Sequence, residues 1–576
     1  MIFQEPMTSL NPVMTDAQQI GEVLQRHTDM SKQQIHQRMV ELLDSVGIPD
    51  PTQRLQEYPH QLSGGMKQRV MIAIALAGEP DLLIADEPTT ALDVTIQAQV
   101  LELLLEIKQC TGMAILLITH DLGVVAQVAD RVGVMYAGQL VEQASVTDFF
   151  STPQHPYSQK LFDSLPEMDK RGQQLDVIRG NVPPLTQRFT ACRFVDRCDQ
   201  AWEACSVSEP DWIDLTKDRG VRCLLADPAH ADRLAATADK PEAVSVAQAQ
   251  ASAEAGQKLL TVRDLRVHFP IHKGLFKSVA GHVHAVDGLS LDLDSGRTLA
   301  LVGESGCGKT TAGKGILQLL RSFTRGRIEL LGRDLMAMQG QALRQSRTDY
   351  QIIFQDPYAS MNPRMMVDEI IQEGMVAQQI GGSAQQRSDR VAELLQQVGL
   401  TADMRYRYPH EFSGGQRQRL CIARALAVQP KLIICDEPTS ALDVSVQAQV
   451  LNLLKELQGR LGLAYLFITH DISVVAYMAD EVAVMYLGRI VEQGPVDDVL
   501  NSPRHPYTEA LLSAVPQADP GSKHKIIRLS GELPSPINPP QGCYFHPRCP
   551  KVMPECKQQY PEKTGTAHTV SCHLYK

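Results

Sequence analysis

Short apolar runs alternate with amphipathic, helix-like stretches in two parts of this chain. Four of the runs are typical of buried parallel strands, namely residues 82–85, 114–118, 432–435 and 464–468. The first and third lead into Asp-Glu, and the second and fourth lead into Thr-His. This alternation predicts an α/β fold with a largely parallel sheet. Polar residues at the carboxyl ends of parallel strands lie where such sheets bind ligands.

The pattern occurs twice because the chain contains an internal repeat. Pro59–Leu104 aligns without gaps on Pro409–Leu454, with 30 identities in 46 positions. The offset of 350 or 351 also relates Phe3-Gln4-Glu5-Pro6 to Phe354-Gln355-Asp356-Pro357, and His155-Pro156-Tyr157 to His505-Pro506-Tyr507. A repeat this long predicts two copies of one domain.

The second copy carries a motif that binds phosphate. The apolar run Leu299–Val302 precedes Gly303-Glu304-Ser305-Gly306-Cys307-Gly308-Lys309-Thr310-Thr311, which fits G-x-x-x-x-G-K-[ST]. The glycines let backbone N–H groups curl around a phosphate, and the following helix directs its positive end toward it. We expect Lys309 to reach the β- and γ-phosphates of a nucleotide, and Thr310 to bind Mg²⁺.

The first copy, as written, has no counterpart of this motif. Only three residues precede Gln4, whereas about 95 residues separate the start of the second domain from Gln355. A natural truncation and a start placed at an internal Met both explain the difference. We favour the second explanation, because Met1-Ile2-Phe3 begins inside an expected strand.

Cysteines mark a segment after each copy. Eight of the twelve cysteines form two matching quartets, Cys192, Cys198, Cys205 and Cys223, then Cys543, Cys549, Cys556 and Cys572. Residues 226–258, rich in Ala with scattered charges, are typical of a tether. We therefore divide the chain into a truncated domain (1–160), a Cys segment (161–225), a linker (226–258), a complete domain (259–507) and a second Cys segment (508–576).

Composition narrows the class of protein. Hydrophobic residues make up 43% and charged residues 21% of the chain, as in ordinary globular proteins. The formal net charge of -11 argues against a broad nucleic-acid footprint. No apolar run is long enough for a spanning helix, and the first residues do not resemble a signal peptide, so we expect a reducing compartment, where disulfides are disfavoured. Four thiolates per segment suit zinc or an iron–sulfur cluster, with unliganded thiols as a third interpretation.

The ordered set of motifs resembles the nucleotide-binding domains of ATP-binding-cassette (ABC) transporters. Leu62-Ser63-Gly64-Gly65-Met-Lys-Gln-Arg69 and Phe412-Ser413-Gly414-Gly415-Gln-Arg-Gln-Arg419 match the signature motif of that family. Each precedes Asp-Glu-Pro-Thr, Ala-Leu-Asp-Val and Thr-His in the same order. The resemblance implies tandem P-loop NTPase domains, each with a helical signature subdomain, and ATPase activity with ATP and Mg²⁺.

The resemblance also implies roles for single residues. Asp436 binds Mg²⁺ together with Thr310 and Gln355, and Glu437 polarises the attacking water as the general base. His470 matches the switch histidine, which contacts the γ-phosphate. In this family a domain's ATP is closed by the signature of the opposite domain, here Ser63-Gly64-Gly65. The first copy offers a degenerate site, with the residues Gln4, Asp86, Glu87 and His120 facing Ser413, Gly414 and Gly415.

The Cys segments and the His-Pro-Tyr motifs resemble the oligopeptide, dipeptide and glutathione importer branch. Its C-terminal segment can carry a [4Fe–4S] cluster, although the first quartet departs from its Cys-x-x-His-Pro-x-Cys pattern. The resemblance implies a peripheral protein on the cytoplasmic face of the inner membrane. Its ATPase domains would pair within the chain. Its partners would be two permease subunits and an external solute-binding protein, which leaves the cargo open.

Two alternatives belong to other classes. Excision-type DNA-repair ATPases also have tandem cassettes and Cys₄ sites, but they carry large insertions between the phosphate loop and the signature. Here only 104 positions separate Lys309 from Ser413. Ribosome-acting cassette proteins fit less well, because they usually lack such Cys segments.

Overall fold

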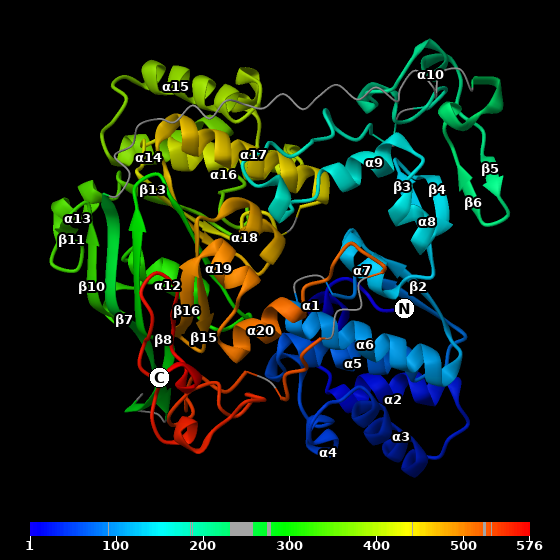
Figure 1. The fold of residues 1–576 in the computed structure, drawn as a ribbon, viewed down its shortest axis with the longest axis horizontal. Helices are drawn as coiled ribbons and strands as arrows, with labels where there is room; N and C mark the ends of the chain where they lie inside the picture. Colours follow the sequence, from blue (N-terminus) through cyan, green and yellow to red (C-terminus); the bar gives the residue numbers. More distant parts are fainter. Residues whose placement is uncertain are drawn as a thin grey trace. The chain divides into compact units, whose positions relative to one another are not determined.

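The computed structural model describes residues 1–89, 92–184, 186, 188–230, 257–273, 278–440, 442–521, 526–531 and 533–576. These residues fall into two compact units (Figure 1). The first comprises Met1–Ser158, Val182–Ala236 and Ala514–Arg528, and the second comprises Gln159–Asn181, Thr237–Ser513 and Leu529–Lys576. Most of the predicted linker, residues 231–256, lies outside the described residues.

A seven-stranded sheet forms the centre of the second unit. Its strand order is β12-β13-β14-β9-β15-β16-β17, in which the first five strands are parallel and the last two antiparallel. The predicted α/β class is therefore confirmed. The bounds are β9 Thr298–Val302, β12 Tyr350–Ile353, β13 Leu432–Asp436, β14 Ala464–Ile468, β15 Glu481–Tyr486, β16 Arg489–Pro495 and β17 Thr569–Val570.

The central strands of this sheet are buried on both faces. Every residue of β9, β13 and β14 is buried, which explains their continuous apolar runs. Tyr465 and Phe467 of β14 pack into one apolar cluster, and Leu466 and Ile468 pack into another. Period-two side-chain alternation thus gives the sheet two hydrophobic layers.

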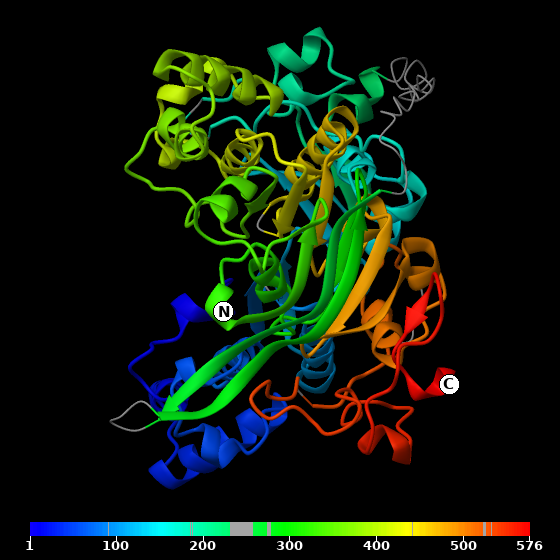
Figure 2. The same ribbon diagram turned by 90° about the vertical axis from the view of Figure 1, so that its left-hand side faces the viewer.

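A second, antiparallel sheet in this unit has the order β11-β10-β7-β8. Its strands are β7 Lys258–Lys273, β8 Ser278–Asp294, β10 Thr324–Leu330 and β11 Arg333–Asp334. Figure 2 shows β7 and β8 as a long twisted ribbon. Several register shifts interrupt their pairing, so the apolar positions do not alternate strictly along either strand.

Helices cover the main sheet of the second unit, and they include the predicted helical signature subdomain. Their bounds are α12 Lys309–Ile316, α13 Gly340–Ser346, α14 Val367–Ala377, α15 Ala384–Gln397, α16 Gly414–Leu426, α17 Val444–Leu461, α18 Ile472–Met478, α19 Val496–Asn501 and α20 Pro506–Ser513. α14, α15 and α16 pack on one another. Their buried faces join the cluster that contains Tyr465.

The first unit repeats part of this architecture. β1 Leu82–Asp86 and β2 Ala114–Ile118 are parallel, and Ile2 bridges Ala85 as Ile353 pairs with Cys435 in the second unit. A separate sheet has the order β3-β4-β6-β5, with bounds β3 Arg131–Tyr136, β4 Gln139–Ser145, β5 Ile213–Thr216 and β6 Arg219–Val221. The helices are α1 Pro6–Ser9, α2 Asp16–His27, α3 Lys32–Ser45, α4 Pro51–Arg54, α5 Gly64–Leu76, α6 Val94–Thr111, α7 Leu122–Val128, α8 Val146–Ser151, α9 Pro156–Asp163 and α10 Glu203–Val207.

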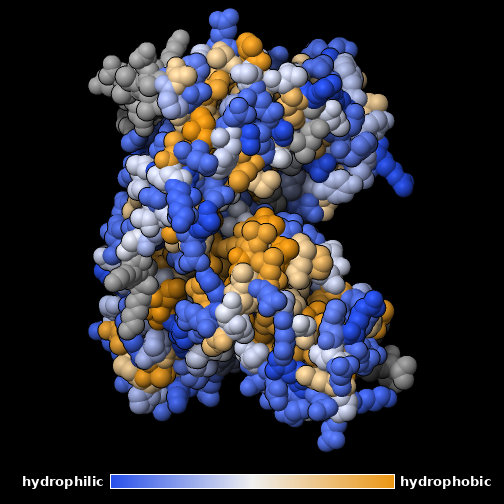
Figure 3. Space-filling view, turned by 90° about the vertical axis from the view of Figure 1, so that its right-hand side faces the viewer, coloured by the Kyte–Doolittle hydropathy of each residue, from blue (hydrophilic) through white to orange (hydrophobic). Residues whose placement is uncertain are grey.

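The corresponding β-strands of the two units differ in exposure. Leu116 and Ile118 of β2 are 52% and 45% exposed, whereas their counterparts Leu466 and Ile468 are fully buried. In the second unit β9 pairs with β14, and residues of β7, β8 and α12 join Leu466 and Ile468 in one cluster. Figure 3 shows apolar side chains gathered on one face of the molecule. The same apolar sequence pattern therefore gives a buried strand in one unit and a partly exposed strand in the other.

Residues 159–181 follow the first His-Pro-Tyr motif but pack in the second unit. Leu175 is 2% exposed within the cluster that contains Tyr465. Its N–H donates to Asn452 Oδ1 at 3.0 Å, and its carbonyl accepts from Asn452 Nδ2 at 2.8 Å. Conversely, Ala514–Arg528 belongs to the first unit, where Arg528 pairs with Glu102 of α6. The two Cys segments thus begin with exchanged stretches, which the sequence-based division at 160 and 507 did not contain.

The two longest α-helices, α6 and α17, have 18 residues each. Within the part of the chain that the structure describes, neither these nor any shorter helix is apolar and long enough to cross a bilayer.

Candidate ATP site

The phosphate loop follows β9 and ends at the start of α12. Its backbone requires glycine at two positions. Gly303 has φ +150° and Gly308 has φ +105°. A Cβ atom at Gly303 would lie 2.2 Å from the carbonyl oxygen of Met485, and one at Gly308 would lie 2.1 Å from that of Ala285. The glycines of the motif therefore allow the loop to pass directly over neighbouring backbone.

Lys309 is buried and folds back on this loop. Its Nζ donates to the carbonyl oxygens of Gly303 at 2.7 Å and Glu304 at 3.0 Å. An ammonium group held by two neutral carbonyls can exchange these weak partners for phosphate oxygens. The position at the first turn of α12 suits the predicted role of Lys309 in phosphate binding.

Two of the three residues predicted to bind Mg²⁺, Thr310 and Asp436, are hydrogen-bonded to each other. The hydroxyl of Thr310 donates to Oδ1 of Asp436 at 2.8 Å. Burial raises the pKa of Asp436, and the nearby Glu437 raises it further, against the lowering by Thr310. A divalent cation would favour the ionised carboxylate at this position. Hydroxyl and carboxylate oxygens are also the donors that Mg²⁺ prefers.

Glu437 lies at the centre of the predicted catalytic group. Its Oε2 accepts from Gln355 Nε2 at 2.8 Å, and its Oε1 lies 3.3 Å from His470 Nδ1. Burial alone would raise the pKa of Glu437, but the hydrogen bond and charge of His470, with Lys309 and Gln355, outweigh burial and lower it. Glu437 also has φ +47°, a left-handed conformation that is unusual for this residue. The structure thus brings together all three predicted catalytic residues.

The first unit contains the same arrangement. Gln4 Nε2 donates to Glu87 Oε2 at 2.6 Å, and His120 Nδ1 lies 3.0 Å from Glu87 Oε1. Glu87 has φ +45°, close to the value for Glu437. Asp86 precedes it at the end of β1. Gln4, Glu87 and His120, which the sequence assigns to the degenerate site, therefore repeat the contacts of Gln355, Glu437 and His470.

The two signature motifs each begin a helix. Ser63 is the N-cap of α5 and accepts from Met66 N–H, and Ser413 is the N-cap of α16 and accepts from Gln416 N–H. Gly64 and Gly414 are the first helical residues. Gly65 and Gly415 pack beside the side chains of Ile96 and Val446. The remaining N–H groups of both first turns suit an anion, as the sequence predicts.

The His-Pro-Tyr motif forms the start of a helix in each unit. The N–H groups of His155 and His505 donate to the buried carboxylates of Glu142 and Glu492, at 2.9 and 3.0 Å. Burial lowers the pKa of His155 to about 4. His155 is therefore neutral, and its Nδ1 accepts the N–H of Tyr157 at 3.0 Å.

The thiols of each Cys quartet lie near one another. Cys192, Cys198, Cys205 and Cys223 line one small cavity in the first unit. In both quartets the first cysteine donates its N–H to the carbonyl of the third, at 3.1 Å for Cys192 and 2.8 Å for Cys543. Burial, together with the neighbouring thiols, raises the pKa of Cys198 and Cys543 to about 11. A bound metal ion would compensate for the cost of ionising such thiols.

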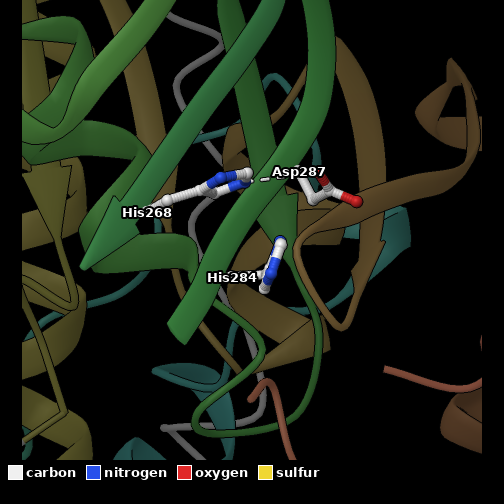
Figure 4. A group of neighbouring side chains, drawn as sticks. All are labelled: His268, His284 and Asp287. Carbon is white, nitrogen blue, oxygen red and sulfur yellow. Dashed lines mark ion pairs between the residues drawn. The ribbon is translucent and has the colours of Figure 1, made fainter. Parts of the chain in front are cut away.

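One further group of potential metal ligands consists of His268, His284 and Asp287 on β7 and β8 (Figure 4). The imidazole rings lie 4.2 Å apart, and His268 Nε2 lies 3.3 Å from Asp287 Oδ1. Asp287 also accepts from the guanidinium of Arg489 at 2.7 Å and from Tyr544 Oη at 2.8 Å. Because a cation already neutralises the carboxylate, we interpret this group as an ion-pair network that joins β8 to the C-terminal segment.

Phe269 and Phe276 are two aromatic residues that precede the phosphate loop and lie near enough in the sequence to be considered for stacking on adenine. Phe269 is partly buried, packs against the apolar cluster of Leu466 and lies 5.1 Å from the ring of Phe323. Phe276 lies outside the described residues. Sequence analysis missed Tyr507 and Arg548, which both bond to Glu304 of the phosphate loop.

Comparison with known proteins matches two family models. The model described as "ABC transporter" covers residues 1–90 and 286–440. The model described as "Oligopeptide/dipeptide transporter, C-terminal region" covers residues 141–205 and 491–556. Both matches occur twice along the chain, in the order of the internal repeat.

Individual relatives match over most of this chain. A glutathione import ATP-binding protein of Pectobacterium atrosepticum is 47% identical over 93% of this chain and 78% of its own length. An oligopeptide transport ATP-binding protein of Mycobacterium tuberculosis is 46% identical over 91% of this chain and 85% of its own length. This chain belongs to the ABC transporter ATP-binding proteins.

A solved nucleotide-free ATP-binding cassette of an ABC transporter also matches, at 22% identity and a TM-score of 0.36, over 43% of this chain and 96% of its own. As a member of the family, the chain is an ATPase with two P-loop NTPase cassette regions.

Proposed function

We propose that this ABC ATPase hydrolyses ATP to drive the import of peptides of the dipeptide, oligopeptide or glutathione class. The observation that carries the proposal is that the second copy has both a full catalytic group and a transporter-type C-terminal region. Gln355, Glu437 and His470 meet beside the Thr310–Asp436 pair, and residues 491–556 match that region. The relatives named for glutathione and oligopeptide transport support the substrate class.

The geometry supports a division of labour at the site. Lys309 exchanges its loop carbonyls for the β- and γ-phosphates, while Thr310 and Asp436, with Gln355, hold Mg²⁺. Glu437, kept ionised by His470, accepts a proton from the attacking water. His470, the charged partner of Glu437, positions that water and contacts the γ-phosphate. Closure of the site by Ser63, Gly64 and Gly65 stays a prediction from the sequence, which Ser63→Arg tests.

We infer that the protein works at the cytoplasmic face of the inner membrane with two permease subunits and an external solute-binding protein. The family and the import functions named for its relatives support these partners. Since permeases select the cargo in this arrangement, the chain itself leaves the peptide open.

We also propose that each Cys quartet holds an iron–sulfur cluster, with zinc as the alternative. Tetrahedral zinc with Zn–S bonds of about 2.3 Å brings its sulfurs within about 4 Å of one another. Among the described residues, only His268, His284 and Asp287 bring three ligand atoms within 4.8 Å of one another. The thiols of each quartet are therefore spaced more widely than a single zinc ion requires. A four-iron cluster is larger and suits the wider spacing. Iron analysis after anaerobic purification tests this, and zinc without iron would contradict it.

Reconstitution with its permeases tests the transport function. We expect glutathione, a dipeptide or an oligopeptide, each supplied with the solute-binding protein, to stimulate ATP hydrolysis and to enter vesicles. The Glu437→Gln protein is the matched control, since it should bind to the permeases and neither hydrolyse nor transport. Hydrolysis that none of the three substrates stimulates would contradict the proposed substrate class.

A further inference from the structure

The loop between the first two cysteines of the second quartet, residues 543–549, lies against the ATP-binding part of its own unit. We call it the tail loop. Tyr544 donates to Asp287 of β8, and Phe545 packs in an aromatic group with Tyr486 and Tyr507. Arg548, next to Cys549, reaches the phosphate loop. Three of the five residues between the two cysteines therefore contact strands or loops that surround the nucleotide site.

The contact of Arg548 is a bidentate ion pair with Glu304, the second residue of the phosphate-loop motif. Nη1 donates to Oε2 at 2.7 Å and Nη2 donates to Oε1 at 3.1 Å. The two side chains are 3% and 5% exposed. A planar fork on a buried carboxylate fixes both distance and orientation. Loss of the guanidinium would leave the carboxylate buried without its cation.

The backbone of Glu304 is held as firmly as its side chain. Its N–H donates to the hydroxyl oxygen of Tyr507 at 2.8 Å. Its carbonyl accepts from Lys309 Nζ at 3.0 Å and from the N–H of Cys307 at 3.2 Å. Glu304 is thus connected at one end to the C-terminal segment and at the other to the lysine that is proposed to bind phosphate.

The first copy provides an internal comparison. Phe194, the counterpart of Phe545, packs in the same way on Tyr136 and Tyr157. Arg197, the counterpart of Arg548, donates to the hydroxyl of Tyr136 at 3.1 Å. The aromatic anchor is therefore common to both copies, and in the second copy Arg548 also pairs with Glu304 of the phosphate loop.

We propose that Arg548 is a positioning residue for nucleotide binding, because it holds the phosphate loop in its binding shape through Glu304. The Cys tail of the second copy is then a structural part of the ATP site. This inference rests on the proposed role of Lys309 and the phosphate loop, and it adds a function for the tail that is independent of the transported substrate.

The test measures nucleotide affinity in the full-length protein. We expect Arg548→Met to weaken binding of a fluorescent ATP analogue at least tenfold and to raise KM for ATP by a similar factor, with a smaller change in kcat. Arg548→Lys, which keeps the charge but loses the fork, should show an intermediate loss. The control Lys551→Met removes an exposed ion pair with Glu509 in the same segment and should leave both constants unchanged.

A double-variant cycle separates positioning from general damage. Glu304→Gln removes the carboxylate that Arg548→Met leaves unpaired, so the double variant should bind ATP no worse than Arg548→Met alone. Additive losses, or unchanged affinity in Arg548→Met and Arg548→Lys, would overturn the inference. Failure of the unmodified protein to bind ATP would instead contradict the proposed function.

Discussion

Nδ1 of His470 lies 3.3 Å from Oε1 of Glu437, and the corresponding atoms of His120 and Glu87 lie 3.0 Å apart. The pair thus occurs in both copies, and in each the glutamate has a left-handed backbone conformation. In the second copy each partner favours the charged form of the other. Burial opposes the charge on His470, but the hydrogen bond and charge of Glu437 outweigh it and raise the pKa of His470.

Glu437→Gln should remove the group that accepts the proton from water. We expect kcat to fall by roughly 10² to 10⁴, the usual range for loss of a general base. Nucleotide binding should persist, because Lys309 and Thr310 are unchanged. Steady-state ATPase assays and equilibrium binding measure the two effects. A kcat within a few-fold of the unmodified protein would show that Glu437 is not the base.

The His470–Glu437 pair should make stability depend on pH. The raised pKa of His470 contributes stability below its ordinary value of 6.5, and this is lost as pH rises through the raised pKa. The lowered pKa of Glu437 contributes stability above its ordinary value of 4.5, which is lost as pH falls. The difference in Tm between the unmodified protein and His470→Gln should therefore be largest between about pH 4.5 and 6.5. A difference that grows steadily above pH 7 would contradict this sign.

The repeat offers a matched test of burial. Leu466→Ala should lower the free energy of unfolding of the second unit by about 2–5 kcal/mol, because the side chain is fully buried. Leu116→Ala, its counterpart at 52% exposure, should change stability by less than about 0.5 kcal/mol. Thermal or denaturant unfolding, followed in each unit, distinguishes them. Equal losses would mean that the face of β2 is covered in solution.

Asn452 should be more important to stability than its position on a helix suggests. Its side chain satisfies both backbone groups of the buried Leu175, so Asn452→Leu should cost about 1–3 kcal/mol in the second unit. The control is Glu102→Gln on α6, which removes an exposed ion pair with Arg528 worth under about 1 kcal/mol. In Asn452→Leu, the rate of hydrogen exchange at the backbone amide of Leu175 should also rise. Unchanged protection there would contradict the assignment.

Residues close to strand ends could be predicted from sequence because the chemistry follows directly from the pattern. A buried run that ends in Asp-Glu places Asp436 and Glu437 at the ligand-binding edge of a parallel sheet, and the structure has them there. The phosphate loop could also be predicted from the sequence, because its motif requires glycine at Gly303 and Gly308, where the structure leaves no room for a Cβ atom.

Other features depend on contacts between distant segments and have little local signal. The pairing of β7 with β8 includes register shifts, so strict alternation is lost and the antiparallel sheet was not predicted. The exchanged stretch around Leu175 has few apolar residues of its own. Its position depends on hydrogen bonds to Asn452, which lies 277 positions away in the sequence. The one available hint for Arg548 was its recurrence as Arg197, directly before the second cysteine of each quartet.

Each unit is completed by a stretch whose chain neighbours belong to the other unit, through residues 159–181 and 514–528. Cutting the chain inside the predicted linker would therefore not yield two self-sufficient halves. Each fragment would carry one stretch that its own unit does not use and would lack one that it needs. If the two halves were separate polypeptides, each would have to bind a stretch of the other. Residues outside the catalytic groups would then determine which polypeptides pair.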